Sequence, residues 1–355
     1  MKKIAILNFQ YSNHNFGAVL QAAALEDACR ALGHEVQHLD YIPKRTVSLK
    51  GRIGKLLRKL GLRKEFKPKK AGNEEAFERF RCNYLTRTRR LISRSDFFLI
   101  AAEFDAVVVG SDQVWRPEYT NDAIAYFLAY VPNGVGRVAY AASFGKATWD
   151  PESYPSLTDQ ARSELKKFKA ISCREQSGVH ICKDVFGVAA EQVLDPLLLV
   201  DQLFIDGIIT RSSVVQGSKL IYYKLDSTVN FEEDLEAVSN EIGSDAVNIY
   251  LKGREFREVP DWVAFIRFSE VVLTDSYHCI CLALRFGKKV IFCPNEKRGQ
   301  TRLDSLFNLL NIELEPLELE LKTPMYKLVA PDDIETIINK ERLRSREFLI
   351  EALTI

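Results

Sequence analysis

The sequence has almost no net charge, and it has no long apolar run. Over 355 residues, 49 lysines and arginines face 48 acidic residues, which leaves a formal charge of +1. A nucleic-acid-binding protein should carry a marked basic excess, so this balance excludes nucleic acid as a partner of the chain as a whole. No run of about eighteen apolar residues occurs, so we expect no membrane-spanning helix.

The sequence also lacks a cysteine framework. Its seven cysteines are an odd number, and none forms a C-x-x-C pair or stands at zinc-ligand spacing from a histidine. This predicts reduced thiols in a cytoplasmic protein, and no metal site. The first apolar run is broken by Asn8 and Gln10 and has no cleavage site. We therefore interpret it as a strand and not as a signal peptide.

What the sequence does contain is a repeated alternation of short apolar runs with segments of helical period. This pattern is typical of α/β folds whose parallel strands are buried on both faces. Strands are expected at residues 4–9, 35–41, 105–110, 137–143, 170–173 and 192–195, then at 219–225, 246–251, 271–275 and 288–293. The two sets predict two parallel α/β domains.

The same pattern suggests where the domains begin and end. We expect an N-terminal domain, a crossover linker, a smaller C-terminal domain and a charged terminal helix that packs back on the first domain. Their bounds are 1–200, 201–217, 218–330 and 331–355.

One segment breaks the charge balance. Residues 44–70 hold twelve basic residues and one acid, so they carry +11 while the rest of the chain carries −10. Ile53, Leu56, Leu57 and Leu60 recur there at helical spacing, with basic residues around them. Such a helix suits peripheral contact with an anionic membrane. The alternative is an insert whose leucines pack on its own domain.

The junction after the first strand lacks the G-x-G-x-x-G fingerprint of dinucleotide-binding folds, because Gly17 is its one glycine. Asn13, His14 and Asn15 favour a polar, neutral ligand instead.

Polar residues follow the strand expected at 105–110. Ser111, Asp112 and Gln113 come directly after it, and Trp115 stands close by. The carboxyl end of a parallel strand is the usual place for a ligand, and an aromatic ring beside an acid and an amide suits a sugar. The alternative is that Ser111 and Asp112 cap the next helix.

Arg174 and Glu175 stand where the strand at 170–173 gives way to a helix. Arginine grips carboxylate or phosphate oxygens with two parallel hydrogen bonds. The alternative is a surface ion pair between the two residues.

A further strand ends in Asp275 and Ser276, and His278 lies in the first turn of the apolar helix that follows. The free amide groups of a helix N-terminus attract phosphate. His278 is therefore well placed to exchange a proton during turnover. The alternative is a buried histidine hydrogen-bonded to Asp275.

Six different motifs follow one another along most of the chain. They are NFGAVLQAAAL (15–25), GSDQVWRP (110–117), AYAASFG (139–145), SCREQSG (172–178), VLDPLLL (193–199) and TDSYHCICLALRFGKKVI (274–291). Together they resemble the polysaccharide pyruvyl transferase family, with the basic insert and the last two dozen residues outside the resemblance.

The resemblance implies two Rossmann-like domains facing across a cleft, similar to the glycosyltransferase B type. It implies phosphoenolpyruvate as donor, bound by the second domain, and a sugar or lipid-linked oligosaccharide as acceptor, bound by the first. The product is a cyclic pyruvate ketal of a surface polysaccharide or its precursor, released with phosphate. No cofactor is implied besides this co-substrate.

Position by position, His278, Arg174, Asn15, Gly17, Gln21, Asp112 and Gln113 match the family's motifs, and the chemistry of their side chains indicates roles for the remaining candidates. Proton transfer falls to His278, Asp112 and Asp275, and donor binding to Arg174, Ser276, Lys289, Arg298 and Arg302. Acceptor binding falls to Asn15, Gly17, Gln21, Ser111, Gln113 and Trp115.

Two positions depart from the family pattern. Many relatives have Gly where Cys279 stands, and others have Arg where Ser276 stands. A nucleotide-sugar glycosyltransferase of the same architecture is one alternative. A glycan-binding relative whose donor site Cys279 has spoiled is another.

Overall fold

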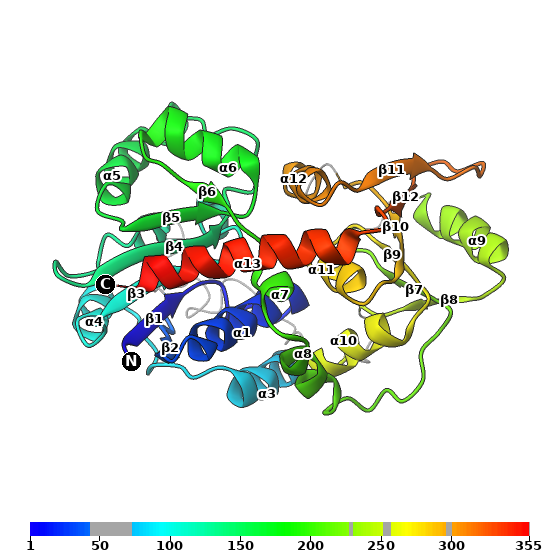
Figure 1. Cartoon of the computed structure of the whole chain (residues 1–355), viewed down its shortest axis with the longest axis horizontal. Coiled ribbons are helices and arrows are strands. Elements are labelled where there is room, and N and C mark those ends of the chain that lie inside the picture. Colours follow the sequence, from blue (N-terminus) through cyan, green and yellow to red (C-terminus); the bar gives the residue numbers. More distant parts are fainter. Residues whose placement is uncertain (43–72, 227–229, 251–256, 296–299, 355) are drawn as a thin grey trace, which may run out of the picture.

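The structure is a computed structural model that describes residues 1–42, 73–226, 230–250, 257–295 and 300–354. The basic segment 44–70 and Arg298 lie outside the described residues. The chain folds into two β-sheets, each with helices packed around it (Figure 1). Among the described helices, none has the length and apolar character needed to cross a membrane.

The first sheet is parallel throughout, in the order β2-β1-β3-β4-β5-β6. Its strands are β1 (Lys3–Leu7), β2 (Glu35–His38), β3 (Ala106–Val109), β4 (Gly136–Ala142), β5 (Ala170–Cys173) and β6 (Glu191–Gln192). Its α-helices are α1 (Phe16–Ala31), α3 (Glu74–Tyr84), α4 (Arg94–Ala101), α5 (Pro155–Leu165) and α6 (Gln176–Ile181). Short turns of other helix types are η1 (Pro117–Tyr119), η2 (Ala123–Phe127) and η3 (Cys182–Phe186).

The second sheet has the order β11-β12-β10-β9-β7-β8. Four strands are parallel: β7 (Leu220–Tyr223), β8 (Ala246–Asn248), β9 (Val271–Thr274) and β10 (Lys289–Phe292). Two more, β11 (Glu313–Pro316) and β12 (Tyr326–Val329), add an antiparallel edge that the sequence did not predict. The helices are α9 (Phe231–Ile242), α10 (Val259–Phe268), α11 (Tyr277–Arg285) and α12 (Thr301–Leu309).

The first strand of each sheet lies between the second and the third, in the orders β2-β1-β3 and β8-β7-β9. This reversal is the topological switch point of doubly wound α/β folds, beside which ligands bind at the carboxyl ends of the strands. The prediction of two Rossmann-like domains is confirmed.

Apolar packing joins the two domains. Phe16 at the start of α1 stacks on Trp262 of α10, with ring centroids 5.2 Å apart, and its ring meets Tyr223 edge-on. Helices α7 (Pro196–Leu199) and α8 (Gln202–Ile209) form the crossover. Because Phe16 is fully buried, the start of α1 is fixed against the second domain.

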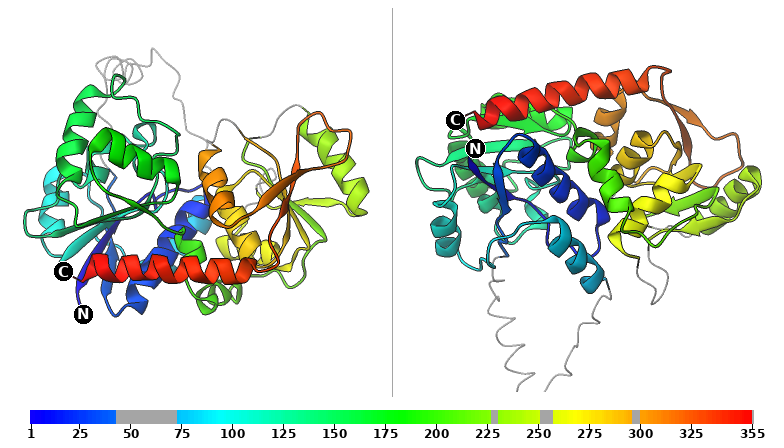
Figure 2. Two further views of the ribbon diagram at one scale, coloured as in Figure 1. Left: turned by 45° about the horizontal axis from the view of Figure 1, so that its top comes forward. Right: turned by 60° about the horizontal axis from the view of Figure 1, so that its bottom comes forward.

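The terminal helix α13 (Ile334–Leu353) runs across both domains (Figures 1 and 2). Ile338 near its start belongs to the apolar cluster shared with the second domain, whereas Phe348 packs on Tyr140 of the first, with ring centroids 6.3 Å apart. Its Ser345 hydroxyl accepts a hydrogen bond from the amide of Leu194 (2.9 Å). The terminal helix therefore packs against both domains.

Candidate active site

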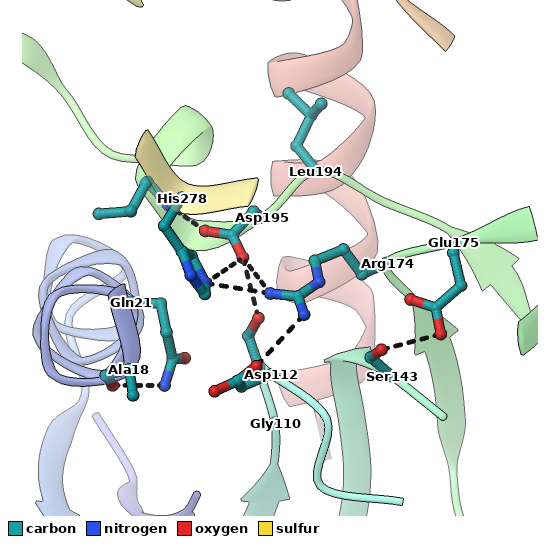
Figure 3. Close-up of polar contacts among 12 residues, drawn as sticks. Ala18, Gln21, Gly110, Asp112, Ser143, Arg174, Glu175, Leu194, Asp195 and His278 are labelled. Atoms are coloured by element: carbon teal, nitrogen blue, oxygen red, sulfur yellow. Dashed lines mark hydrogen bonds and ion pairs between the residues drawn. The ribbon is translucent and has the colours of Figure 1, made fainter. Parts of the chain in front are cut away.

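Polar side chains that follow four strands of the two domains meet in one cluster (Figure 3). Asp112 follows β3, Arg174 follows β5, Asp195 follows β6, and His278 is the second residue of α11 after β9. Their exposed fractions are 5%, 1%, 0% and 4%. Because the carboxyl ends of parallel strands share one edge of a sheet, three separate segments of the first domain reach a histidine of the second.

The guanidinium of Arg174 is the centre of this cluster. One terminal nitrogen donates to Asp195 Oδ2 at 2.9 Å and lies 3.1 Å from His278 Nε2, while the other donates to Asp112 Oδ1 at 3.3 Å. Burial alone would lower the pKa of Arg174, but the neighbouring carboxylates, Asp195 above all, raise it. Arg174 is therefore a permanent cation, held in one orientation by charge-assisted hydrogen bonds. The alternative interpretation of Arg174 and Glu175 as a surface ion pair is wrong, because both side chains are buried.

Asp195 is the functional candidate that sequence reasoning missed. Its Oδ2 also accepts from the Ser111 hydroxyl at 3.2 Å, and its Oδ1 accepts from the amide of Leu197 at 3.0 Å, which caps α7. Burial opposes its ionisation, yet His278, Arg174 and the Leu197 amide hold the pKa of Asp195 well below its ordinary value. Asp195 therefore stays a carboxylate. The Asp-Pro pair that opens α7 after a strand end was the signal that could have found it.

His278 lies close to both the Arg174 guanidinium and the Asp195 carboxylate. Its Nε2 is 3.1 Å from the Arg174 guanidinium and 3.5 Å from Asp195 Oδ2. Arginine can only donate, so Nε2 accepts from Arg174 when the ring is neutral, whereas a protonated ring would turn Nε2–H toward Asp195. Either protonation state therefore has a partner in place, as a proton-transfer group requires.

His278 also packs tightly against α1. A methyl group added at Gly17 would lie 2.1 Å from His278 Nδ1 and 2.3 Å from Cγ. No side chain can occupy that space, so the glycine lets the helix approach the ring. Gly17 was predicted to bind the acceptor, and the structure gives it this steric role.

Asp275 does not join the cluster. Its carboxylate accepts from Lys224 Nζ at 3.1 Å, from the amide of Leu225 at 2.8 Å and from Asn295 Nδ2 at 2.7 Å. It therefore ties the end of β9 to the segments after β7 and β10. The alternative that His278 is a buried histidine hydrogen-bonded to Asp275 is wrong, because Asp195 is the carboxylate beside its Nε2.

A second buried arginine comes from the other domain. Arg302 of α12 is 7% exposed, and its guanidinium lies over the Tyr277 ring at 5.8 Å, while Arg174 lies over the same ring at 4.4 Å. Burial and the charge of Arg174 lower the pKa of Arg302. Two cations that repel each other in a buried site favour the binding of an anion.

The pKa values of two buried carboxyls near the arginines are shifted in opposite directions. Burial disfavours the charge of Asp112, but Arg174, His278 and Arg302 lower the pKa of Asp112 overall. For Glu175, burial dominates and raises the pKa. Glu175 Oε1 accepts from the Ser143 hydroxyl and the Phe144 amide, each at 2.9 Å, so this carboxyl orders the loop after β4.

The sequence profile described as "Polysaccharide pyruvyl transferase" matches residues 15–297. The chain belongs to this family. The expectation drawn from the six motifs is thereby confirmed, and the protein is a transferase of polysaccharide pyruvylation.

Several solved structures are similar to the chain at low sequence identity. A UDP-GlcNAc 2-epimerase from Neisseria meningitidis bound to UDP-GlcNAc is 11% identical over 99% of both chains, with a TM-score of 0.48. A putative UDP-N-acetylglucosamine 2-epimerase from Listeria monocytogenes is 12% identical over 99% of this chain and 91% of its own, with a TM-score of 0.49. Spinosyn forosaminyltransferase is 14% identical over 99% of this chain and 95% of its own, with a TM-score of 0.42. No curated protein matches the chain.

The remaining predicted acceptor residues of the transferase, Asn15, Gln21 and Gln113, all belong to the first domain. Asn15 is exposed and caps α1, with Oδ1 accepting from the amide of Ala18 at 3.2 Å. Gln21 is buried one turn later, and its Nε2 donates to the Ala18 carbonyl at 2.7 Å. Its Oε1 has no hydrogen-bond partner within the described residues. Gln113 Oε1 accepts from Arg116 at 3.0 Å.

The residues around His278 order the first turn of α11. The hydroxyl of Ser276, predicted to bind the donor, accepts from the amide of Cys279 at 3.5 Å and caps the helix. Cys279 is fully buried in the apolar cluster between the domains, and burial raises the pKa of its thiol. The family's glycine is thus replaced by an inert, core-facing side chain.

Two predicted site residues of the transferase must be corrected. Trp115, expected to stack on a sugar, is 1% exposed, donates its Nε1–H to the Tyr126 carbonyl and stacks on Phe127. Lys289, expected to bind the donor, opens β10 beside Val271, the first residue of β9. Since His278 follows the carboxyl end of β9, Lys289 lies at the opposite edge of the sheet.

We predict that Gly17→Ala lowers transferase activity about a hundredfold, because a displacement of about 1 Å at a catalytic group has that effect. Gly207→Ala is the matched control, since an added methyl group in helix α8 meets no atom within 4 Å. The double variant Gly17→Ala/His278→Ala removes the clash and should unfold at higher urea than Gly17→Ala alone. Wild-type activity in Gly17→Ala would refute the contact.

We also predict a pH-dependent contribution of Asp195. A carboxyl whose pKa is lowered by folding stabilises the protein above the ordinary Asp pKa of about 4, and this stabilisation is lost as the pH falls through the lowered pKa. Asp195→Asn should therefore cost about 3 kcal/mol of unfolding free energy at pH 7, and less as the pH falls below about 4.

Urea unfolding between pH 7 and 3 measures this difference. Asp159→Asn is the control, because its carboxylate is 80% exposed and should change the stability by at most about 0.5 kcal/mol. A difference for Asp195→Asn that stays constant over the whole range would contradict the assignment.

Proposed function

We propose that the protein transfers the enolpyruvyl group of phosphoenolpyruvate to two hydroxyls of one sugar in a surface polysaccharide or its lipid-linked precursor. The reaction forms a cyclic pyruvate ketal and releases phosphate, at the cytoplasmic side of the membrane. The observation that carries the proposal is the buried contact of Arg174 with His278 and Asp195, in a member of the pyruvyl transferase family.

The chemistry requires a proton donor, a cationic site and a proton acceptor. C3 of the enol gains a proton, a sugar oxygen bonds to C2, and the bond from C2 to the phosphate oxygen breaks. The second hydroxyl then closes the ring on C2. Of the two hydroxyl protons released, one balances the proton added at C3 and the other leaves with phosphate.

His278 is our candidate for the acid that protonates C3 or the leaving phosphate. Asp195 Oδ2 lies 3.5 Å from its Nε2, and the Arg174 guanidinium lies 3.1 Å from the same nitrogen. The histidine thus has a hydrogen-bond partner at Nε2 in either protonation state. Asp112, a carboxylate on the same guanidinium, is our candidate to accept a hydroxyl proton.

The donor carries a carboxylate and a phosphate, so its binding needs more than one cation. Arg174 and Arg302 converge on Tyr277 from different domains, and the N-terminus of α11 lies beside them. Together they can offset the charge that builds up on the leaving phosphate. The polar residues at the start of α1, Asn15 and Gln21, are our candidates for the acceptor side.

The substitution at position 279 does not argue against turnover. Cys279 packs in the apolar core, and no part of the Arg174 cluster depends on its side chain. A non-catalytic glycan-binding protein would need no buried pair of arginine and histidine, and such a pair is expensive to bury without a function.

Phosphate release from phosphoenolpyruvate, measured on an array of sugar acceptors, tests the proposal. We expect release that depends on the acceptor, and we expect His278→Ala to lower kcat about a hundredfold or more, the usual effect of losing a general acid. His180→Ala, an exposed histidine of α6, is the control. Equal release by wild type and His278→Ala, or no release with any acceptor, would refute it.

A further inference from the structure

A short stretch of the first domain, residues 89–99, exposes large apolar side chains among arginines. We define the α4 patch as Arg89, Arg90, Ile92, Arg94, Phe98 and Leu99. Its three apolar side chains are 41%, 50% and 62% exposed in chain order. Its three arginine side chains are 57%, 54% and 68% exposed. This density of exposed apolar groups is a sign of an interaction surface.

Core packing does not explain the outer apolar side chains of α4. The helix already buries Phe97 and Ala101 completely, and the Phe97 ring meets Tyr41 edge-on at 5.2 Å. Phe98 and Leu99 point away from that face. These two side chains do not contribute to the core, and as exposed apolar groups they lower the solubility of the protein.

The arginines of the α4 patch give its outer layer a positive charge. Their carboxylate partners lie underneath: Asp40 and Asp122 are 7% and 8% exposed, and Asp96 is 26% exposed. Arg90 pairs with Asp40 at 2.7 Å and Arg94 with Asp122 at 3.3 Å. An approaching surface therefore meets guanidinium groups first and is shielded from the acids.

The α4 patch begins at the carboxyl edge of the first sheet, which also carries the site. Leu91 bridges to Tyr41 just after β2, and the amide of Ile42 donates to the Leu91 carbonyl at 3.0 Å. In the sequence, the segment 44–70 with its charge of +11 follows Ile42 almost directly. Positive charge is thus concentrated on this part of the chain.

We propose that the α4 patch binds the surface of an anionic lipid bilayer. Its apolar side chains enter the interface, and its arginines contact lipid phosphates, as in other peripheral proteins. A bilayer accepts single protruding side chains without a matching groove, which a folded protein partner would need. This inference rests on the proposed function in one respect: a lipid-linked acceptor would then lie on the same side as the carboxyl edge of the sheet.

Vesicle flotation of the full chain tests the proposal. We expect binding to vesicles of phosphatidylcholine with phosphatidylglycerol, and weak binding to phosphatidylcholine alone. Phe98→Ser/Leu99→Ser should lower the partition coefficient about tenfold. Leu343→Ser/Ile350→Ser is the matched control on α13, where the two side chains are 62% and 44% exposed, and it should leave binding unchanged.

The charged half of the α4 patch has its own test. Arg89→Gln/Arg90→Gln/Arg94→Gln should weaken binding to the anionic vesicles by roughly a hundredfold and make it less dependent on salt. Equal partition of wild type and either α4 variant would overturn the proposal, and so would an equal loss in the α13 control.

Two further measurements separate this proposal from neighbouring ones. In a chain that lacks residues 44–70, Phe98→Ser/Leu99→Ser should still lower binding, and complete loss of binding by the deletion alone would overturn the role of the α4 patch. Phosphate release with a water-soluble acceptor should be the same for the α4 variants and wild type. Vesicle binding without any such release would refute only the proposed function.

Discussion

The rest of the site depends on one buried cation, the guanidinium of Arg174. It binds carboxylates that follow two different strands and lies against an imidazole from the other domain. A charge removed from water at this depth is tolerated only if every partner is in place, and the loss of one partner costs about 3–5 kcal/mol. The relative position of the two domains is therefore part of the site, because His278 reaches Arg174 only when the domains pack as they do here.

The fold holds that position from several sides. Gly17 lets α1 press against the His278 ring, while Phe16 stacks on Trp262 of the second domain. The short helix α7 follows Asp195, and its Leu197 and Leu198 carbonyls accept hydrogen bonds from Arg285 of α11 (3.0 Å) and Arg342 of α13 (2.9 Å). Both ends of α11 are thus tied to the crossover: His278 to the residue before α7, and Arg285 to α7 itself.

Much of this could be predicted from the sequence, and the failures have physical causes. Apolar runs such as AVVV in β3 identify buried strands, and polar residues after such runs belong to one edge of a sheet. That reasoning placed Asp112, Arg174 and His278. It missed Asp195, whose Asp-Pro pair is equally typical of a plain helix start. It missed β11 because all four of its residues are exposed and supply no apolar run. The burial of Trp115 depends on distant packing that local sequence does not encode.

The donor and the histidine should meet at the Arg174 cluster. A crystal structure of the protein with phosphoenolpyruvate bound tests this most directly. We expect the phosphate within hydrogen-bond distance of His278 and of a guanidinium from each domain, Arg174 and Arg302, with the methylene carbon facing the imidazole. Phosphoenolpyruvate bound instead beside Lys224 and Asp275, out of reach of His278, would contradict the account.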